Sequence, residues 1–255
     1  MDAYGKFAKV YDSLMEDVPY DEIANIISDE IKAKKIQNNI VLDLACGTGT
    51  LTSLLLKKGY EMIGADASVE MLDVAKAKNP DTLFLNQSMD EFELYGTVGA
   101  ICCSLDSINY LTEDGELEKT FNLCNNYLEP NGLFIFDINT EYKFKNILSD
   151  NIFTYDSENL FYAWENEYIK EEKLCNFYLT FFIKENEHFF RFDEVHTERV
   201  YTDREITKTL KKCGFTVLKR YDGFTKNKAH KKSERVLYVC ENTDSIQLKN
   251  MKLRG

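Results

Sequence analysis

The sequence predicts an α/β protein with a doubly wound, mostly parallel seven-stranded sheet. Short apolar runs alternate with helical patterns through the first 140 residues. A glycine-rich turn follows the first of these runs, and a later aromatic segment with strict alternation interrupts the pattern. We expect a single domain over residues 1–255, with a β-rich insertion at 141–201.

Periodicity and capping residues predict the elements in order. The apolar runs that predict strands lie at 40–44, 61–65, 82–86, 98–104, 133–137, 215–221 and 235–240. Helical spacing predicts helices at 20–36, 50–58, 68–78, 112–128 and 203–213. Ser68 and Thr112 are the expected N-caps of the third and fourth helices, and Thr202 with Glu205 forms a capping box before the last. A turn at 130–132 is expected before the fifth strand.

The inserted segment has its own pattern. Mostly apolar residues alternate over 160–168 and 175–183, and Phe190, Phe192, Glu194 and His196 continue the period of two over 190–196. This pattern predicts an antiparallel meander with turns at 170–173 and 185–187. The insertion leaves the fifth strand at the carboxyl edge of the sheet, where ligands bind in doubly wound folds. We therefore expect it to form a lid over the ligand crevice.

Composition limits the class of partner. The net charge is -12 and the pI is near 4.9. A broadly acidic surface repels the phosphate backbone, so nucleic acid is a disfavoured partner. The basic run at 226–232 is expected to be a solvated loop.

Targeting and membrane segments are not evident in the sequence. No apolar stretch follows the N-terminal residues as in a signal peptide, and no apolar run approaches the roughly 20 residues that span a bilayer. The seven cysteines are scattered and form no CxxC pair, which is typical of proteins with reduced thiols. These features predict a cytoplasmic protein without a membrane partner.

The segment 41–50, VLDLACGTGT, is the most informative motif. Gly47 and Gly49 permit positive φ and close approach of a ligand to the backbone at the end of the first strand. Asp66 ends the second strand, where a carboxylate can accept both hydrogen bonds of a ribose diol. The alternatives are an ordinary strand-to-helix turn and an Asp that caps the next helix. A nicotinamide or flavin fingerprint fails at Thr52, and no P-loop lysine follows.

With these motifs, the sequence resembles class I S-adenosylmethionine-dependent methyltransferases over residues 40–139. The segments 11–12, 87–90 and 106–111 resemble a smaller group that is similar to amino-sugar N,N-dimethyltransferases and glycine N-methyltransferases and includes uncharacterised bacterial relatives. The resemblance implies a Rossmann-like methyltransferase fold, S-adenosylmethionine as cofactor and a small-molecule methyl acceptor.

The resemblance also implies a set of cofactor contacts. They are Tyr11, Ala45, Gly47, Gly49, Asp66, Ala67, Met71, Ser88, Met89 and Leu105. Asp66 would hold the ribose hydroxyls, Ser88 and Met89 would meet the adenine edge, and the backbone near Leu105 would meet the ammonium. The family often has Asp where Ser88 stands. Tyr11 would close over the site.

Three side chains are candidates for direct roles in catalysis: Tyr11, Asp106 and His196. His196 is either a general base or a histidine satisfied within the insertion sheet. Asp106 follows the fourth predicted strand and either orients a cationic acceptor or caps a local turn.

Aromatic residues of the insertion are candidates for an acceptor pocket. Tyr155, Trp164 and Tyr168 either wall this pocket or form the core of the meander. Asp137 and Asn139 are two oxygen ligands without a third, so no metal is expected.

The sequence leads to a methyltransferase that acts on a small-molecule N or O acceptor by direct in-line transfer. An RNA methyltransferase using residues 226–232 is an alternative, as is a partner protein that binds cofactor without catalysis. A nicotinamide oxidoreductase is disfavoured by Thr52. The sequence leaves open whether the chain is a monomer or a homodimer.

Overall fold

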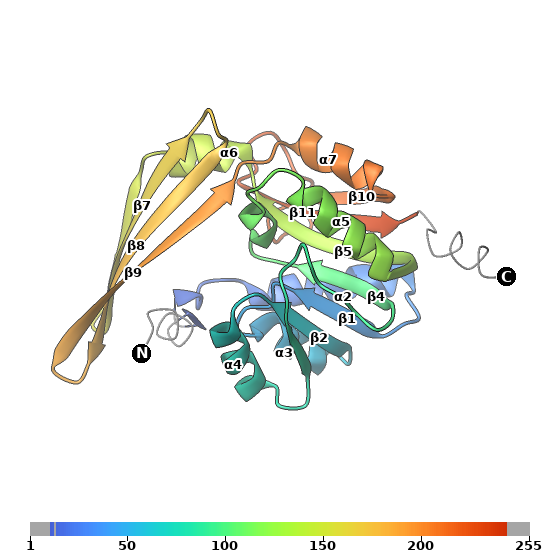
Figure 1. The fold of residues 1–255 in the computed structure, drawn as a ribbon, viewed down its shortest axis with the longest axis horizontal. Coiled ribbons are helices and arrows are strands. Elements are labelled where there is room, and N and C mark those ends of the chain that lie inside the picture. Colours follow the sequence, from blue (N-terminus) through green and yellow to red (C-terminus); the bar gives the residue numbers. More distant parts are fainter. Residues whose placement is uncertain (1–10, 13, 244–255) are drawn as a thin grey trace.

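The computed structural model describes residues 11, 12 and 14–243 (Figure 1). The helices are α2 (Tyr20–Lys34), α3 (Thr50–Lys57), α4 (Val69–Lys78), α5 (Glu116–Tyr127), α6 (Glu141–Lys143) and α7 (Asp203–Lys212), with a 3-10 turn η1 (Ser107–Tyr110) and a π turn η2 (Phe144–Leu148). The strands are β1 (Ile40–Leu44), β2 (Glu61–Asp66), β3 (Leu83–Asn86), β4 (Val98–Cys103), β5 (Leu128–Asn139), β6 (Ile152–Asp156), β7 (Leu160–Ile169), β8 (Leu174–Glu185), β9 (His188–Arg199), β10 (Phe215–Asp222) and β11 (Arg235–Asn242).

The main sheet has seven strands in the order β10-β11-β5-β4-β1-β2-β3. Strands β1 to β5 pair in parallel, whereas β11 is antiparallel to both β5 and β10. This arrangement confirms the predicted mostly parallel sheet. The chain order reverses between β1 and β4, and in such folds the ligand crevice lies beyond the carboxyl ends of the strands at this switch point.

Helices cover both faces of the sheet, so its central strands are buried and mostly apolar. Ile27 of α2 and Leu55 of α3 belong to the buried cluster on one face. Phe121 of α5 and Leu210 of α7 belong to the cluster on the other face. Every residue of β4 is buried as a result.

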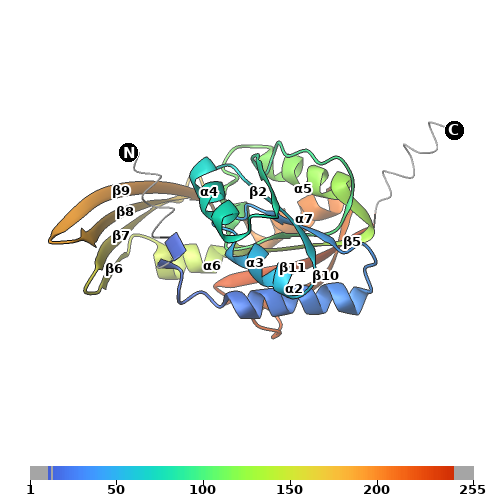
Figure 2. The ribbon, with the colours of Figure 1, turned by 90° about the horizontal axis from the view of Figure 1, so that it is seen from below.

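The insertion forms a separate antiparallel sheet in the order β6-β7-β8-β9. Figures 1 and 2 show it projecting from the main body as a long twisted ribbon. The expected turns lie where predicted, between β7 and β8 and between β8 and β9. The expectation of three alternating runs was incomplete, because β6 also pairs with β7. All five residues of β6 are exposed, so burial imposed no alternation that a sequence pattern could reveal.

Two expectations around α5 were wrong. The helix begins at Glu116 after Gly115, which has φ +95°, and not at Thr112. The carbonyl of Thr112 instead accepts a hydrogen bond from Arg199 of the insertion, at 2.8 Å. The turn at 130–132 lies within β5, where Asn131 has a left-handed conformation and the register with β4 shifts.

The predicted caps of α4 and α7 are confirmed. Ser68 accepts a hydrogen bond from the Met71 amide, and Thr202 with Glu205 forms the reciprocal capping box. Within the described ranges, no helix is both long and apolar enough to cross a membrane.

Candidate active site

The turn between β1 and α3 forms one wall of the candidate site. Ala45, Gly47 and Gly49 all have positive φ, at 59°, 52° and 72°. A Cβ on Gly47 would have no atom within 4 Å, so the backbone is open on that side. A Cβ on Gly49 would lie 3.0 Å from the Ala75 Cβ, so this glycine allows α4 to pack closely. The two glycines therefore serve different needs, one facing open space and one facing a helix.

Asp66 lies across from this turn at the end of β2. Its Oδ2 accepts the Gly47 amide at 2.8 Å, and its Oδ1 accepts the Ser68 amide at 2.9 Å. Burial raises the pKa of Asp66, although the amide hydrogen bonds oppose this shift. Each carboxylate oxygen retains a second lone pair, so Asp66 fits the two hydroxyls of a ribose.

Thr52 explains why the dinucleotide fingerprint fails. Its hydroxyl donates to Oδ2 of Asp43 at 2.5 Å, and both residues are buried. Burial raises the pKa of Asp43 to about 6, against the hydrogen bond from Thr52. The hydroxyl at position 52 therefore satisfies a buried acid on β1, a role that a glycine or alanine cannot fill.

The segment before α2 is tied to the glycine turn by Asp12. Its Oδ1 accepts the Thr48 hydroxyl at 2.6 Å, and its Oδ2 pairs with Lys78 at 2.6 Å. The neighbouring Tyr11 is half-buried. Burial is the largest cause that raises its pKa, with further contributions from Tyr20, Asp106 and Asp66. Tyr11 is therefore close enough to Asp106 and Asp66 for their charges to affect its hydroxyl.

The backbone after β4 is held in an unusual conformation. Leu105 and Asp106 have φ values of 61° and 54°, a region that costs non-glycine residues about 1–2 kcal/mol each. Asp137, at the end of β5, accepts both of their amides, at 2.8 and 3.0 Å. The Leu105 N–H is therefore engaged, and only its carbonyl oxygen is left to meet an ammonium group.

Arg235 of β11 pairs with both acids at this position. Its guanidinium bonds Asp137 and lies 2.6 Å from Oδ1 of Asp106. Although burial acts to raise the pKa of Asp106, Arg235 and Lys143 hold it below its usual range. Asp106 is therefore ionised at neutral pH despite being largely enclosed.

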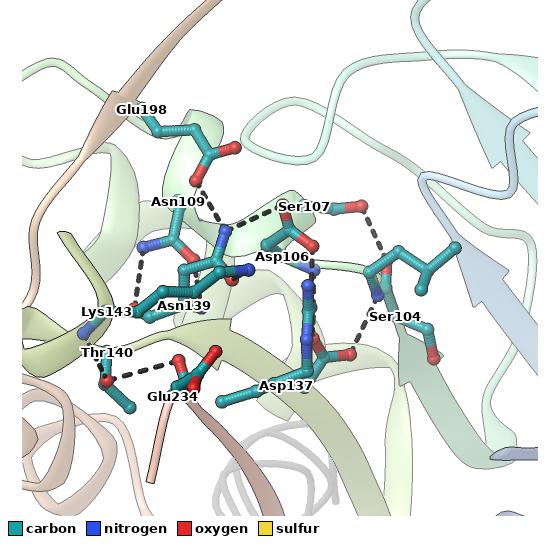
Figure 3. Close-up of polar contacts among 12 residues, drawn as sticks. Ser104, Asp106, Ser107, Asn109, Asp137, Asn139, Thr140, Lys143, Glu198 and Glu234 are labelled. Atoms are coloured by element: carbon teal, nitrogen blue, oxygen red, sulfur yellow. Dashed lines mark hydrogen bonds and ion pairs between the residues drawn. The ribbon is translucent and has the colours of Figure 1, made fainter. Parts of the chain in front are cut away.

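The insertion joins the same network through Glu198 (Figure 3). The amide nitrogen of Asn139 donates to Oδ2 of Asp106 at 2.9 Å and to Oε2 of Glu198 at 3.0 Å. Its oxygen accepts from Lys143 at 2.9 Å. Burial, followed by the Asp106 carboxylate, raises the pKa of Glu198 well above its usual value. A protonated acid from the insertion therefore lies beside an ionised acid from the core.

His196 lies two residues before Glu198 on the same strand. Its Nδ1 is 3.3 Å from the Tyr110 hydroxyl, and the two rings meet edge to face at 5.8 Å. Burial lowers the pKa of His196, so its imidazole is neutral at pH 7. Although the Tyr110 side chain is 44% exposed, partial burial raises the pKa of its hydroxyl, and the nearby Glu198, Asp106 and Tyr11 add to this shift. The structure thus brings the three predicted catalytic residues to one region.

Residues predicted to meet the adenine lie after β3 and around the start of α4. Ser88 donates to Oδ1 of Asp90 at 2.8 Å, which leaves its oxygen able to accept. Met89 packs against the core, with its sulfur 3.7 Å from the Cys103 thiol. Ala67 is exposed and Met71 is half-buried on the first turn of α4.

The predicted acceptor-pocket residues are not grouped together. Trp164 and Tyr168 pack against a small buried cluster at the base of the insertion. Tyr155 stacks on Tyr162 farther out and is 45% exposed. A single pocket wall made of all three is therefore not what the structure presents.

Sequence reasoning missed the charged residues that complete the site. Glu198, Arg235 and Lys143 were not singled out, and Asn139 was considered only as a metal ligand. The available signal was position, because Glu198 and Arg235 each lie at the end of a strand beside the carboxyl edge. Within the described part of the chain, no three His, Cys, Asp or Glu side chains are grouped to hold a metal.

A doubly wound sheet with an open glycine turn, and with an acid at the end of the second strand that can accept from ribose hydroxyls, is typical of enzymes that bind nucleoside cofactors. Methyltransferases are one class of such enzymes. A family model described as a methyltransferase domain matches residues 41–132. YqeM of Bacillus subtilis (strain 168), of the methyltransferase family, is 33% identical over 95% of this chain and 98% of its own length. The crystal structure of an S-adenosylmethionine-dependent methyltransferase from Clostridium acetobutylicum ATCC 824 is 35% identical, with a TM-score of 0.88 over 95% of this chain and 100% of that chain.

The chain belongs to the family of S-adenosylmethionine-dependent methyltransferases. A weaker likeness links it to the dTDP-3-amino-3,4,6-trideoxy-alpha-D-glucopyranose N,N-dimethyltransferase of Streptomyces venezuelae. That enzyme is 29% identical over 44% of this chain and 47% of its own length. The open side of Gly47 and the spare acceptor capacity of Asp66 fit the family's cofactor.

We expect Asp66→Ala to weaken binding of S-adenosylmethionine by about 1.5–3 kcal/mol, the range for hydrogen bonds to a charged group. Isothermal calorimetry with the cofactor and with its demethylated product measures this loss. Asp73→Ala removes an exposed acid from α4 and is the matched control. Equal affinities in the Asp66 and Asp73 variants would remove Asp66 from the cofactor site.

We expect Arg235→Met to lower the free energy of unfolding by about 3–5 kcal/mol, because it leaves the Asp137 and Asp106 carboxylates buried without their cation. The control is Arg220→Met, which breaks a largely exposed pair with Asp203 and is expected to cost about 0–1 kcal/mol. Urea unfolding compares the two. Similar small losses would contradict a structural role for the Arg235 ion pairs.

We expect Glu198→Gln to gain stability relative to the wild type as pH rises. Above a pH of about 4.5 the unfolded chain releases the Glu198 proton, whereas the folded chain retains it up to its raised pKa. Wild-type stability therefore falls across this interval through Glu198, and the glutamine variant lacks that loss. Urea unfolding between pH 4.5 and 8 measures it, with exposed Glu165→Gln as control. A pH-independent difference would show that Glu198 is ionised in the fold.

Proposed function

We propose that the protein methylates an amine nitrogen of a small molecule by direct in-line transfer. The observation that carries this proposal is that Tyr110, whose hydroxyl is 3.3 Å from Nδ1 of the neutral His196, also lies close to the ionised Asp106 and to Tyr11. An ionised acid attracts an ammonium group, and a neutral imidazole can then accept its proton. The N,N-dimethyltransferase from Streptomyces supports an amine acceptor through its own named substrate.

The chain's residues have separable tasks in this proposal. The bound cofactor supplies a methyl group on a positively charged sulfur. Asp106, held by Arg235 and Asn139, attracts and orients the acceptor amine. His196 removes the proton that would otherwise occupy the nitrogen lone pair. Tyr11, which is half-buried, limits the access of water to the reacting atoms.

The insertion serves as an acceptor lid in the same proposal. Its β9 strand contributes His196 and Glu198 to the region around Asp106. Farther along the sheet, Tyr162 of β7 lies near Asp17, which belongs to the segment before α2. We infer that the insertion and this N-terminal segment enclose the acceptor together.

A small molecule is a better candidate than RNA on electrostatic grounds. The net charge of -12 opposes a polyanion. Lys226, the first residue of the basic run, pairs with Asp29 at 2.5 Å, which reduces the free positive charge of that loop.

We expect His196→Asn to lower kcat by about 10²–10⁴-fold while leaving cofactor affinity unchanged, because it removes the proposed base. The wild-type kcat should rise with pH along a limb whose midpoint lies below 6.5, since burial lowers the pKa of His196. The variant should lack this limb.

Release of demethylated cofactor with pooled small amines measures these rates, and calorimetry measures affinity. His188→Asn, at the exposed start of β9, is the matched control. A full rate and an unchanged pH profile in the His196 variant would exclude it as the base. Turnover with RNA and none with any small amine would overturn the proposed function itself.

A further inference from the structure

One face of the insertion sheet carries polar atoms that lack partners. Residues paired across neighbouring strands point to the same side, and Trp164, Leu179 and Glu194 form one such row. The next row toward the main body contains Asn166, Phe177 and His196. We call this side the inner face, because it carries His196 toward Tyr110 of the core.

Three buried atoms of the inner face have no hydrogen-bond partner among the described residues. They are Oε1 of Glu194, Nε1 of Trp164 and Oδ1 of Asn166. Glu194 is only 4% exposed, and burial raises the pKa of its carboxyl with no compensating group. Such an arrangement costs stability, since a buried acid without a partner forfeits its hydration. A ligand that supplies the missing partners would explain its presence.

Aromatic rings flank these atoms. Trp164 meets Phe177 edge to face at 5.5 Å and meets Phe153 in a tilted contact at 5.6 Å. Flat apolar surfaces thus lie beside two acceptors, Glu194 and Asn166, and one donor, Trp164. A ligand for this face needs both hydrogen-bond donors and acceptors, together with an apolar surface.

The position of Glu194 relates it to the proposed reaction centre. Glu194, His196 and Glu198 alternate along β9 and share the inner face. Alternate residues of a strand lie about 6–7 Å apart, so Glu194 is about 13 Å from the end that joins Asp106. It is therefore placed to hold a part of the acceptor away from the reacting amine.

We propose that Glu194, Trp164 and Asn166 form a recognition subsite for a hydroxylated ring that bears the reacting amine, a conclusion that rests on the proposed function. Hydroxyl groups donate to Glu194 and Asn166 and accept from Trp164, and the C–H face of the ring packs on the aromatics. A purely cationic ligand leaves the indole N–H unpaired, and a purely anionic one leaves the carboxylate unpaired. Hydroxyls satisfy both.

Trp164 is the sole tryptophan of the chain, so its fluorescence reports directly on this subsite. In the experiment, the protein is first saturated with S-adenosylhomocysteine. Glucosamine is then titrated into this complex. A parallel titration uses cyclohexylamine, which has a six-membered ring without hydroxyls. We expect a saturable change of Trp164 emission with glucosamine and at least tenfold weaker binding of cyclohexylamine. We expect Glu194→Gln to weaken glucosamine at least tenfold, since it removes a charged acceptor.

Glu165→Gln is the matched control, because residue 165 follows Trp164 on β7 and points to the opposite face of the sheet. It should bind glucosamine like the wild type. Thermal melting gives a second readout, in which Glu194→Gln should raise Tm by removing a buried unpaired acid. No emission change with glucosamine, equal binding of cyclohexylamine, or unchanged affinity in Glu194→Gln would each overturn the subsite. A lowered Tm with unchanged binding would assign Glu194 a structural role instead.

The methyl-transfer assay separates this inference from the proposed function. If the wild type methylates amines and Glu194→Gln methylates them at the same rate, the subsite is refuted and the proposed function stands. Glucosamine binding that depends on Glu194, without turnover of any amine, would refute the function and leave the subsite standing.

Discussion

A single buried carboxylate organises the carboxyl edge of the sheet. Asp137 accepts the amides of Leu105 and Asp106, and thereby holds both residues in a left-handed conformation that they would not adopt alone. The acid is tolerated in the core because Arg235 lies against it. The direction in which Asp106 presents its side chain therefore depends on a strand that enters the sheet last in the sequence.

The same cluster connects three parts of the molecule that would otherwise be independent. Asn139 links Asp106 of the core to Glu198 of the insertion. Tyr11 lies close enough to Asp106 for that charge to raise the pKa of its hydroxyl, and Asp12 bonds this segment to the glycine turn. Asp106 is thus linked to the insertion through Asn139 and lies near the N-terminal segment that contacts the glycine turn. Hydrogen bonds of Asn139 and Asp12 therefore hold the insertion and the N-terminal segment against the main sheet and its glycine turn.

Most of the fold was predictable because its signals are local. Apolar runs buried on both faces, the cap at Ser68 and the capping box at Thr202 each act within a few residues. The glycine turn and Asp66 were predictable for the same reason. The exposed strand β6 was missed because no burial pattern marks it. Arg235 was missed because its partner Asp137 lies 98 positions away in the sequence. Glu198 was missed because its partner Asn139 lies 59 positions away, in a strand of the other sheet.

The dependence on Arg235 has a consequence for the order in which the protein forms. The cofactor-binding motifs lie within the first half of the chain, but the cation that stabilises the end of β4 is in β11, which inserts between β5 and β10. During synthesis, the earlier strands emerge while Asp137 still lacks this cation. Long-range pairing of this kind is slow relative to local helix formation. Competence to bind ligand is thus expected to arrive late in biogenesis, when the C-terminal hairpin docks.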